Sequence, residues 1–352
     1  MKKFDLHVLQ ALSGDSLLLS YIGNDNKEHN VLVDGGMPDT FKRLQRVIDD
    51  EDNDNKNEIE TIDYVFLTHI DQDHIGGILK LLDSSYASKV EKVFFNSGHM
   101  IHQQESSFIS ETDGINLIKQ INNSDGLKAN REEITISTEY NFFGLEISFL
   151  SPTYEALNIF NELTSLPEID EDSFISESKE EREDLDLSQL SQKKFYEKKL
   201  ENDHANGVSL AMLVKYQGIS ILLLGDAKDS VLIPVLEYKK YTKRDKLKVD
   251  YMKLSHHGSK FHTTNEFLEL IDCQHFIISA NGTHKHPNIE TLARILCHEE
   301  RDKSKTIYFY FNYEEEDYED KGVYLLSSTE QENHNCKSIY NKTLFDLVGQ
   351  DG

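Results

Sequence analysis

The stretch Thr68-His69-Ile70-Asp71-Gln72-Asp73-His74-Ile75-Gly76-Gly77 follows an apolar run and carries the strongest chemical signal in the chain. In an extended segment, residues two apart share a face, so we expect His69, Asp71 and Asp73 to point the same way. His74 lies at the turn into a helix and can swing beside them. Four potential ligands within six residues predict a site for two neighbouring cations. The alternative is a polar, solvent-exposed loop that is rich in histidine and aspartate.

Four weaker signals lie at the ends of other apolar runs. Taken alone, each has an ordinary explanation: a strand-ending aspartate, surface histidines, a His-Pro pair in a loop, or a capping loop. Taken together, they stand where strands end or begin, and such positions can converge on one edge of a sandwich. The four segments are Leu222–Asp226, Lys253–Ser259 with its adjacent His256 and His257, His284–Pro287 with His286, and Asn202–Leu210 with His204 and Asn206.

Apolar strand-like segments alternate with segments of helical spacing along most of the chain. Strands grouped toward each end, with helices between them, predict an α/β sandwich of two mixed sheets packed face to face with helices outside. The expected strands lie within 3–36, 61–69, 89–97, 133–152, 207–227, 250–259, 275–281, 306–313 and 322–328, and the expected helices within 40–48, 76–85, 104–122, 230–241 and 289–300.

Two segments depart from this pattern. Residues from about 154 to 203 are largely polar and strongly acidic, which predicts an insertion, part helix and part loop, in a single domain spanning 1–328. Residues 329–352 form the expected C-terminal tail, a loop with a short amphipathic end in which Phe345 and Leu347 could pack on the body or on a neighbour.

The composition limits the possible functions. The chain has 352 residues, with 37 lysines and arginines against 63 aspartates and glutamates, a net charge of −26. This excludes a protein that coats DNA by bulk charge, so nucleic acid could bind only at a local patch, such as Lys239–Lys246, or through bound metal ions. The sequence shows no apolar run of about 18 residues, which predicts no membrane span. Three widely spaced cysteines (Cys273, Cys297 and Cys336) favour a reducing, cytoplasmic setting.

The order of these motifs resembles the metallo-β-lactamase superfamily. The usual first signature of that superfamily is His-x-His-x-Asp-His, and here Asp71 stands in place of the second histidine. This variant, together with the opening Leu12–Leu17 and the motif Ser255–Ser259, is most similar to the C-terminal hydrolase domain of ComEC-type competence proteins, and also resembles bacterial phosphorylcholine esterases. The resemblance covers about 1–328, apart from the acidic insertion.

The resemblance implies a role for each residue of the motifs. It implies that His69 and Asp71 bind one metal, that Asp73 and His74 bind a second, that Asp226 bridges both, and that His257 completes the second site, with His256 as the fallback. It places Asn206 or His204 near the first metal, His286 and Ser259 against a scissile phosphate, and Asp34 as a structural residue near the site. Asp73, His256 and His286 are the expected catalytic residues, and either of the two histidines could protonate a leaving group.

The metals expected in this site are two divalent ions, zinc or manganese. Carboxylate and amide oxygens in place of histidine favour the harder manganese ion. Such a centre would produce a bridging hydroxide at neutral pH and suits phosphodiester cleavage. We therefore predict a phosphodiesterase, first a nuclease acting on DNA. The alternatives are a phosphodiesterase for a small molecule, such as a nucleotide messenger or a phosphorylcholine-like ester, and a partner-regulated effector whose acidic insertion docks another protein.

Overall fold

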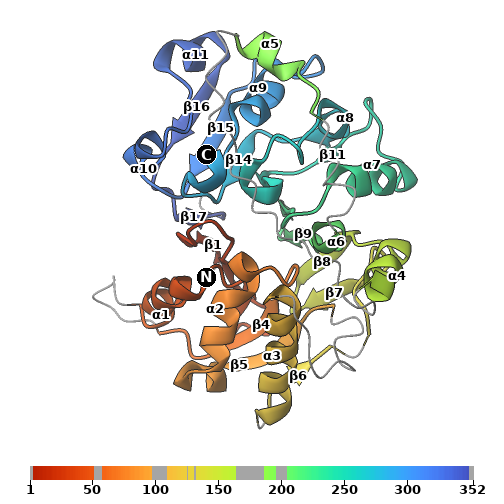
Figure 1. Cartoon of the computed structure of the whole chain (residues 1–352), viewed down its shortest axis with the longest axis vertical. Helices are drawn as coiled ribbons and strands as arrows, with labels where there is room; N and C mark the ends of the chain where they lie inside the picture. Colours follow the sequence, from red (N-terminus) through yellow and green to blue (C-terminus); the bar gives the residue numbers. More distant parts are fainter. Residues whose placement is uncertain are drawn as a thin grey trace.

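The structure is a computed structural model of the chain. It describes residues 3–50, 58–96, 109–124, 126–130, 132–163, 186–195 and 204–348. Most of the acidic segment predicted as a protein-docking insertion lies outside the described residues. Figure 1 shows the N-terminal part of the chain, in red and orange, below the C-terminal part in blue.

The first sheet is mixed. Its N-terminal strands run antiparallel, and its remaining strands run parallel. In spatial order it contains β17 (Leu344–Asp346), β1 (Phe4–Val8), β2 (Leu17–Ile22), β3 (Glu28–Val33), β4 (Ile62–Phe66), β5 (Val90–Phe94) and β6 (Lys128–Ala129).

The second sheet is also mixed, with a parallel half and an antiparallel half. In spatial order it contains β16 (Cys336–Ile339), β15 (Ile307–Phe311), β14 (His275–Ile278), β12 (Tyr251–Lys253), β10 (Ile219–Leu223), β9 (Ala211–Tyr216), β8 (Leu145–Ser151) and β7 (Glu139–Phe142). A short parallel pair, β11 (Leu247–Lys248) and β13 (Ile271–Asp272), stands beside it.

The alternation of side chains along the strands explains the layers. Leu17 and Leu19 of β2 share a buried core with Ile221 of β10, so this core lies between the two sheets. Leu18 points the other way into a second core beneath α1 and α2, and Leu222 points into a third core beneath the helices of the other side. Because residues two apart share a face of a strand, each central strand contributes side chains to two cores.

Helices cover both outer faces, so the predicted α/β sandwich of two mixed sheets is confirmed (Figure 1). The helices are α1 (Phe41–Ile48), α2 (Gln72–Leu82), α3 (Ile109–Asn123), α4 (Tyr154–Leu163), α5 (Leu187–Ser191), α6 (His204–Gly207), α7 (Asp229–Tyr238), α8 (Asn265–Leu268), α9 (Ile289–Cys297), α10 (Glu315–Asp320) and α11 (Ser328–Asn333), with 3-10 turns η1 (Pro38–Thr40), η2 (Ser85–Lys89), η5 (Ser255–Gly258) and η6 (Thr283–Lys285). In the described part of the chain, no helix is long and apolar enough to cross a membrane.

The C-terminal segment differs from the prediction. A loop is expected after residue 328, but the structure has β16 on the edge of the second sheet and β17 on the edge of the first. Phe345 is buried in the core between the sheets, which settles its packing onto the body of the molecule. The loop prediction is wrong because these strands are short and gain their stability from an existing sheet edge rather than from a local pattern.

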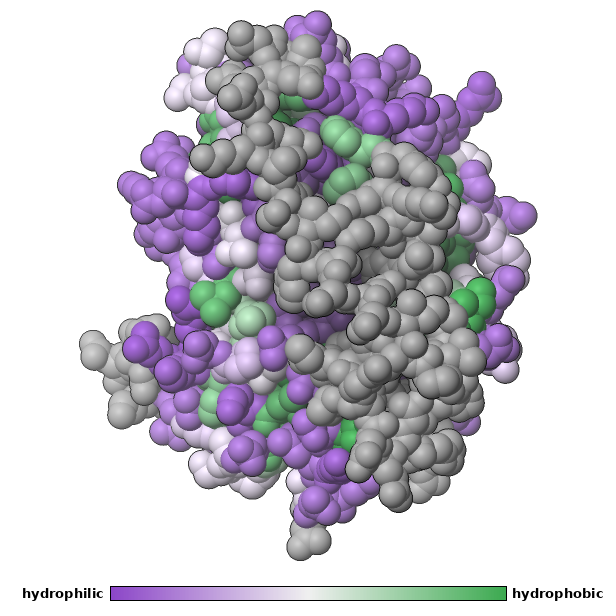
Figure 2. All heavy atoms as spheres, viewed as in Figure 1, coloured by the Kyte–Doolittle hydropathy of each residue, from purple (hydrophilic) through white to green (hydrophobic). Residues whose placement is uncertain are grey.

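Exposed apolar side chains are scattered on the described surface. They belong to Phe143, Tyr154, Ile159, Tyr238 and Leu344. Outside the grey atoms, the surface shown in Figure 2 is mostly hydrophilic, with small separate hydrophobic patches. Isolated exposed apolar residues are normal in folded proteins and do not mark an apolar docking surface.

Candidate metal centre

The first group of site residues follows the parallel strands of the first sheet. β4 ends at Phe66, and α2 begins at Gln72 with Asp71 as its N-cap residue. Asp73 therefore lies in the first turn of a helix and not in extended backbone, which corrects the expected geometry of the signature. His69 stands in the short connection, and His74 is fully buried one residue after Asp73.

The second group comes from the other sheet. Asp226 follows β10, and His256 and His257 follow β12, its parallel neighbour. Both histidines have left-handed backbone angles, with φ of 46° and 56°. Such angles are costly outside glycine and persist where the surroundings enforce them, often at functional sites. The turn brings both imidazoles toward the edge of the sheet where Asp226 lies.

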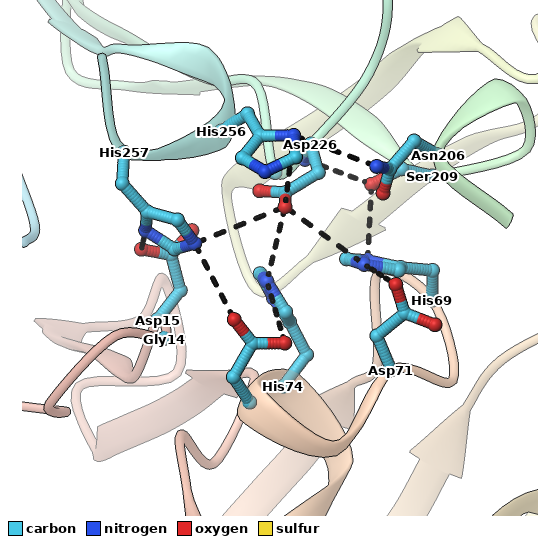
Figure 3. Close-up of polar contacts among 12 residues, drawn as sticks. Gly14, Asp15, His69, Asp71, His74, Asn206, Ser209, Asp226, His256 and His257 are labelled. Atoms are coloured by element: carbon cyan, nitrogen blue, oxygen red, sulfur yellow. Dashed lines mark hydrogen bonds and ion pairs between the residues drawn. The ribbon is translucent and has the colours of Figure 1, made fainter. Parts of the chain in front are cut away.

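Asp226 lies at the centre of four imidazoles (Figure 3). Its Oδ2 atom is 3.5 Å from Nε2 of His74 and 3.7 Å from Nδ1 of His256. It is 3.8 Å from Nε2 of His257 and 4.0 Å from Nε2 of His69. Side chains from both sheets thus meet around one buried carboxylate, as the proposed bridging role of Asp226 requires.

Several buried atoms in this cluster have no hydrogen-bond partner. They are Nε2 of His69, His74 and His257, and Oδ1 of Asp226. An unpartnered polar atom in the protein interior costs free energy, so a group of them that converges on one point needs an explanation. Imidazole nitrogen and carboxylate oxygen are ligands for divalent transition metals, so cations bound among these side chains would supply the missing partners.

The opposite ring nitrogens are already engaged. Nδ1 of His74 is 2.8 Å from Oδ2 of Asp34, and Nδ1 of His257 is 2.8 Å from the carbonyl oxygen of Ser279. Nδ1 of His69 lies 3.0 Å from the hydroxyl of Thr68. Donation from Nδ1 to an oxygen leaves Nε2 as the metal-binding atom and orients the ring, which is the usual support of a histidine ligand.

Among the described residues, three groups of side chains could hold a metal ion, and two of them consist entirely of proposed metal ligands. The ligand atoms of His69, His74 and Asp226 lie within 4.8 Å of one another, and so do those of Asp73, His74 and His257. His74 belongs to both groups, whereas the sequence assigned it to the second metal only. Asp71 belongs to neither, although its Oδ2 atom lies 3.5 Å from Nε2 of His69.

Burial and charge act in opposite directions in this cluster. Burial disfavours the ionised carboxyl of Asp226, but the surrounding histidines outweigh it and hold the pKa of Asp226 well below its ordinary value. Burial also disfavours a charged His257, yet Asp226 and Asp15 raise its pKa to about 9. The site therefore stabilises positive charge in a buried position, which is the electrostatic environment that a divalent cation needs.

A pocket of about 490 Å³ opens beside the cluster. Its wall includes the predicted residues Asn206, His256 and His286, and the amide Nδ2 of Asn206 lies 3.4 Å from Nδ1 of His256. The complete lining is Ser13, Asp71, Asp73, Asn206, His256, His257, Ala280, Asn281, Thr283, His284 and His286.

The predictions for Ser259, His204 and Asp34 have different outcomes. Ser259 is buried, and its hydroxyl accepts a hydrogen bond from the backbone amide of Phe261 at 3.3 Å, so the structure does not support the phosphate contact expected of it. The side chain of His204 lies outside the described residues. Asp34 accepts hydrogen bonds from the amide and hydroxyl of Thr68 at 2.7 Å each, contacts that suit the structural role expected of it.

Several residues beside the cluster have no role predicted from the sequence. Ser209 accepts a hydrogen bond from the amide of Asp226 at 3.0 Å, and Asp15 and Lys253 form a buried ion pair next to His257. These three residues lie inside sequence motifs named above, so their positions in the sequence could have indicated that they lie near the site. His262, whose Nε2 is 3.2 Å from Nδ1 of His256, lies outside the motifs and had no such signal.

Comparison with known proteins supports the superfamily. Residues 13–92 match the family model of the Metallo-beta-lactamase superfamily. The matched region includes the signature around His69 and His74, whereas Asp226 and His257 lie beyond it. No curated protein matches the chain.

Solved structures with this fold resemble the chain only distantly. The metallo-beta-lactamase fold protein YhfI from Bacillus subtilis has 9% identity and a TM-score of 0.42, over 98% of this chain and 99% of that chain. Zinc-bound PqqB from Methylobacterium extorquens has 11% identity and a TM-score of 0.42, over 95% and 87%. A long-form RNase Z from yeast has 11% identity and a TM-score of 0.39, over 88% and 36%.

Proposed function

We propose that this protein is a metal-dependent phosphodiesterase that degrades DNA. The observation that carries the proposal is the set of unpartnered Nε2 atoms of His69, His74 and His257 around Asp226. An open pocket lies beside this set, and its wall includes His257 and Asp73. Two manganese or zinc ions held there would activate a water molecule and stabilise the charged oxygens of an in-line displacement at phosphorus. The ComEC-type variant of the signature, with Asp71 and Asp73, supports nucleic acid as the substrate.

Three side chains on the pocket wall would bind the metal, donate a proton and contact the substrate. Asp73 lies on the pocket wall with its Oδ2 atom 3.7 Å from Nε2 of His257, which suits a ligand of the second ion. His256 faces both Asp226 and the pocket, so it is placed to give a proton to the leaving oxygen. His286 lies on the same wall, with its ring 5.6 Å from that of His256, and is placed to contact a substrate phosphate.

A basic surface supports DNA over a smaller ester. A second pocket, of about 250 Å³, is lined by six lysine or arginine side chains against three acidic ones, in a chain of net charge −26. It includes part of the basic stretch noted in the sequence. The six are Lys243, Arg244, Lys246, Lys248, Arg301 and Lys305. A local basic patch of this kind can contact a phosphate backbone.

The test is degradation of end-labelled single- and double-stranded DNA by the full chain with manganese, zinc or a chelator. We expect cleavage with metal, none with chelator, and none by Asp73→Ala. Asp63→Asn, which alters a buried aspartate at the other end of the sheet, is the control and should cleave as the wild type does. DNA that stays intact under all metal conditions would refute the nuclease proposal.

The second candidate is a phosphodiesterase for a small molecule. The observation that favours it is the size of the site pocket, about 490 Å³, which is typical of pockets for small ligands. The double variant Lys246→Glu and Lys248→Glu separates the two candidates. If DNA is the substrate, DNA cleavage falls and its salt dependence becomes shallower, while cleavage of a small chromogenic phosphodiester is unchanged.

A further inference from the structure

Lys253 is a fully buried lysine at the end of β12. Its ammonium group contacts the Oδ2 atom of Asp15, which is 1% exposed, and the two residues are 238 positions apart in the chain. Removing two charges from water is costly, and buried ion pairs often add little to stability compared with apolar residues of similar size. The pair is therefore poorly explained by stability alone.

Both members of the pair also touch the backbone or side chains of the metal centre. The ammonium of Lys253 donates a hydrogen bond to the carbonyl oxygen of Gly225 at 3.2 Å, directly before Asp226. The same carbonyl accepts the amide of His256 at 3.0 Å. On the other side, Oδ1 of Asp15 lies 3.5 Å from Nδ1 of His257 and has no hydrogen-bond partner (Figure 3).

The loop that carries Asp15 is held against the same ligands. A Cβ atom on Gly14 would lie 1.7 Å from the carbonyl oxygen of Asp73, so only glycine permits this approach to the first turn of α2. The hydroxyl of Ser279 donates to the carbonyl of Gly14 at 3.0 Å, and the carbonyl of Ser279 is the partner of Nδ1 of His257. The Gly14–Asp15 loop, which follows β1 of the first sheet, thus packs against two proposed ligands, Asp73 and His257.

We infer that the Asp15–Lys253 pair positions the metal centre: the carboxylate of Asp15 acts on the ring of His257 through its charge, and Lys253 holds the backbone that presents Asp226. Asp15 also lies within 4.8 Å of ligand atoms of Asp34 and His74, a grouping that could itself attract a cation. Because Lys253 already compensates the charge of Asp15, both act as positioning residues and the centre takes two ions rather than three. This inference rests on the proposed metal centre.

The experiment measures manganese affinity and stoichiometry of the full chain by competition with a fluorescent chelator, together with thermal unfolding of the metal-free protein. Asp15→Asn and Lys253→Met should each lower the melting temperature and weaken manganese binding at least tenfold. The double variant removes both charges, so it should recover much of the melting temperature. It should still bind manganese at least tenfold more weakly than the wild type, because His257 and Asp226 have lost their supports.

Asp15→Glu tests the same point without removing the charge. It keeps a carboxylate for Lys253 but displaces it relative to His257, so manganese binding should weaken although the pair is retained. Asp63→Asn is the matched control, since it disrupts another buried histidine–aspartate contact and should leave manganese binding unchanged.

Three outcomes would overturn the inference. They are recovery of both stability and manganese affinity in the double variant, wild-type affinity in Asp15→Glu, and equal loss of affinity in Asp63→Asn. A wild-type protein that binds neither manganese nor zinc would refute the proposed metal centre itself. Wild-type binding of two ions with unchanged affinity in all variants would refute only the positioning role.

Discussion

A buried histidine–aspartate pair lies at each end of the neighbouring strands β3 and β4. At the amino end, Nδ1 of His29 lies 2.7 Å from Asp63, and its Nε2 lies 3.1 Å from Asp25. The second oxygen of Asp63 accepts the backbone amide of Asn30 at 2.7 Å. Both ring nitrogens of His29 thus have partners, and this pair ties the two strands together.

At the carboxyl ends of the two strands, only one of the two ring nitrogens of His74 has a hydrogen-bond partner. Nδ1 of His74 is bound to Asp34, but its Nε2 has no hydrogen-bond partner and faces Asp226. A buried histidine next to an aspartate is therefore not in itself a sign of function. What separates His74 from His29 is an unpartnered ring nitrogen that faces a second buried carboxylate, as expected of a metal ligand.

The largest loss of metal affinity and activity is expected for Asp226, which lies at the centre of the proposed metal site. Asp226→Asn removes the charge that four imidazoles share, and its amide nitrogen cannot serve as a metal ligand. We expect metal affinity and phosphodiesterase activity to fall by more than roughly 100-fold, the upper range for loss of an outer supporting residue. Metal content after dialysis and DNA cleavage measure the two losses. Full metal content in this variant would contradict the bridging role.

A smaller effect is expected at Asp34, which supports His74 without facing the pocket. Asp34→Asn presents an amide where Nδ1 of His74 donates, so the ring loses its orientation or changes tautomer. We expect manganese affinity to fall about 10- to 100-fold. Titration with manganese gives the value, and unchanged affinity would show that the ring is held by packing alone.

Asp63→Asn is the same substitution at the amino end of the two strands. It should cost about 1–3 kcal/mol of unfolding free energy, because a buried hydrogen bond to His29 is lost. It should leave manganese binding unchanged, as measured by denaturant unfolding and metal titration on one sample. A loss of affinity equal to that of Asp34→Asn would remove the distinction between the two ends.

The motifs at the carboxyl ends of the strands can be found in the sequence because their signals are local. The motifs with His69, Asp226 and His257 each directly follow an apolar run, and parallel strands bring such positions to one edge. What it misses depends on contacts between distant parts of the chain. Lys253 meets Asp15 across 238 positions, and β16 and β17 form only because sheet edges are available to them. The start of α2 at Gln72 was also missed, since a helix N-cap at Asp71 resembles a polar strand end.

The smallest expected effect is the pH dependence of the stability that His29 contributes at the amino ends of β3 and β4. Burial disfavours a charged His29, but hydrogen bonds to Asp63 and Asp25 outweigh it and raise the pKa of His29 above its ordinary value. The folded state therefore binds this proton more tightly than the unfolded state does. The stability gained is fully present below the unfolded pKa of about 6.5 and is lost as the pH rises through the higher folded pKa.

The histidines of the metal centre titrate as well, so the measurement must isolate His29. We would compare the unfolding free energy of wild type and His29→Gln, both free of metal, from pH 5.5 to 9. Because the metal centre is the same in both proteins, its contribution cancels in the difference. The advantage of the wild type should shrink as the pH rises. A difference that is constant with pH would show that His29 stays neutral, and that the amino end is held by hydrogen bonds without a charge.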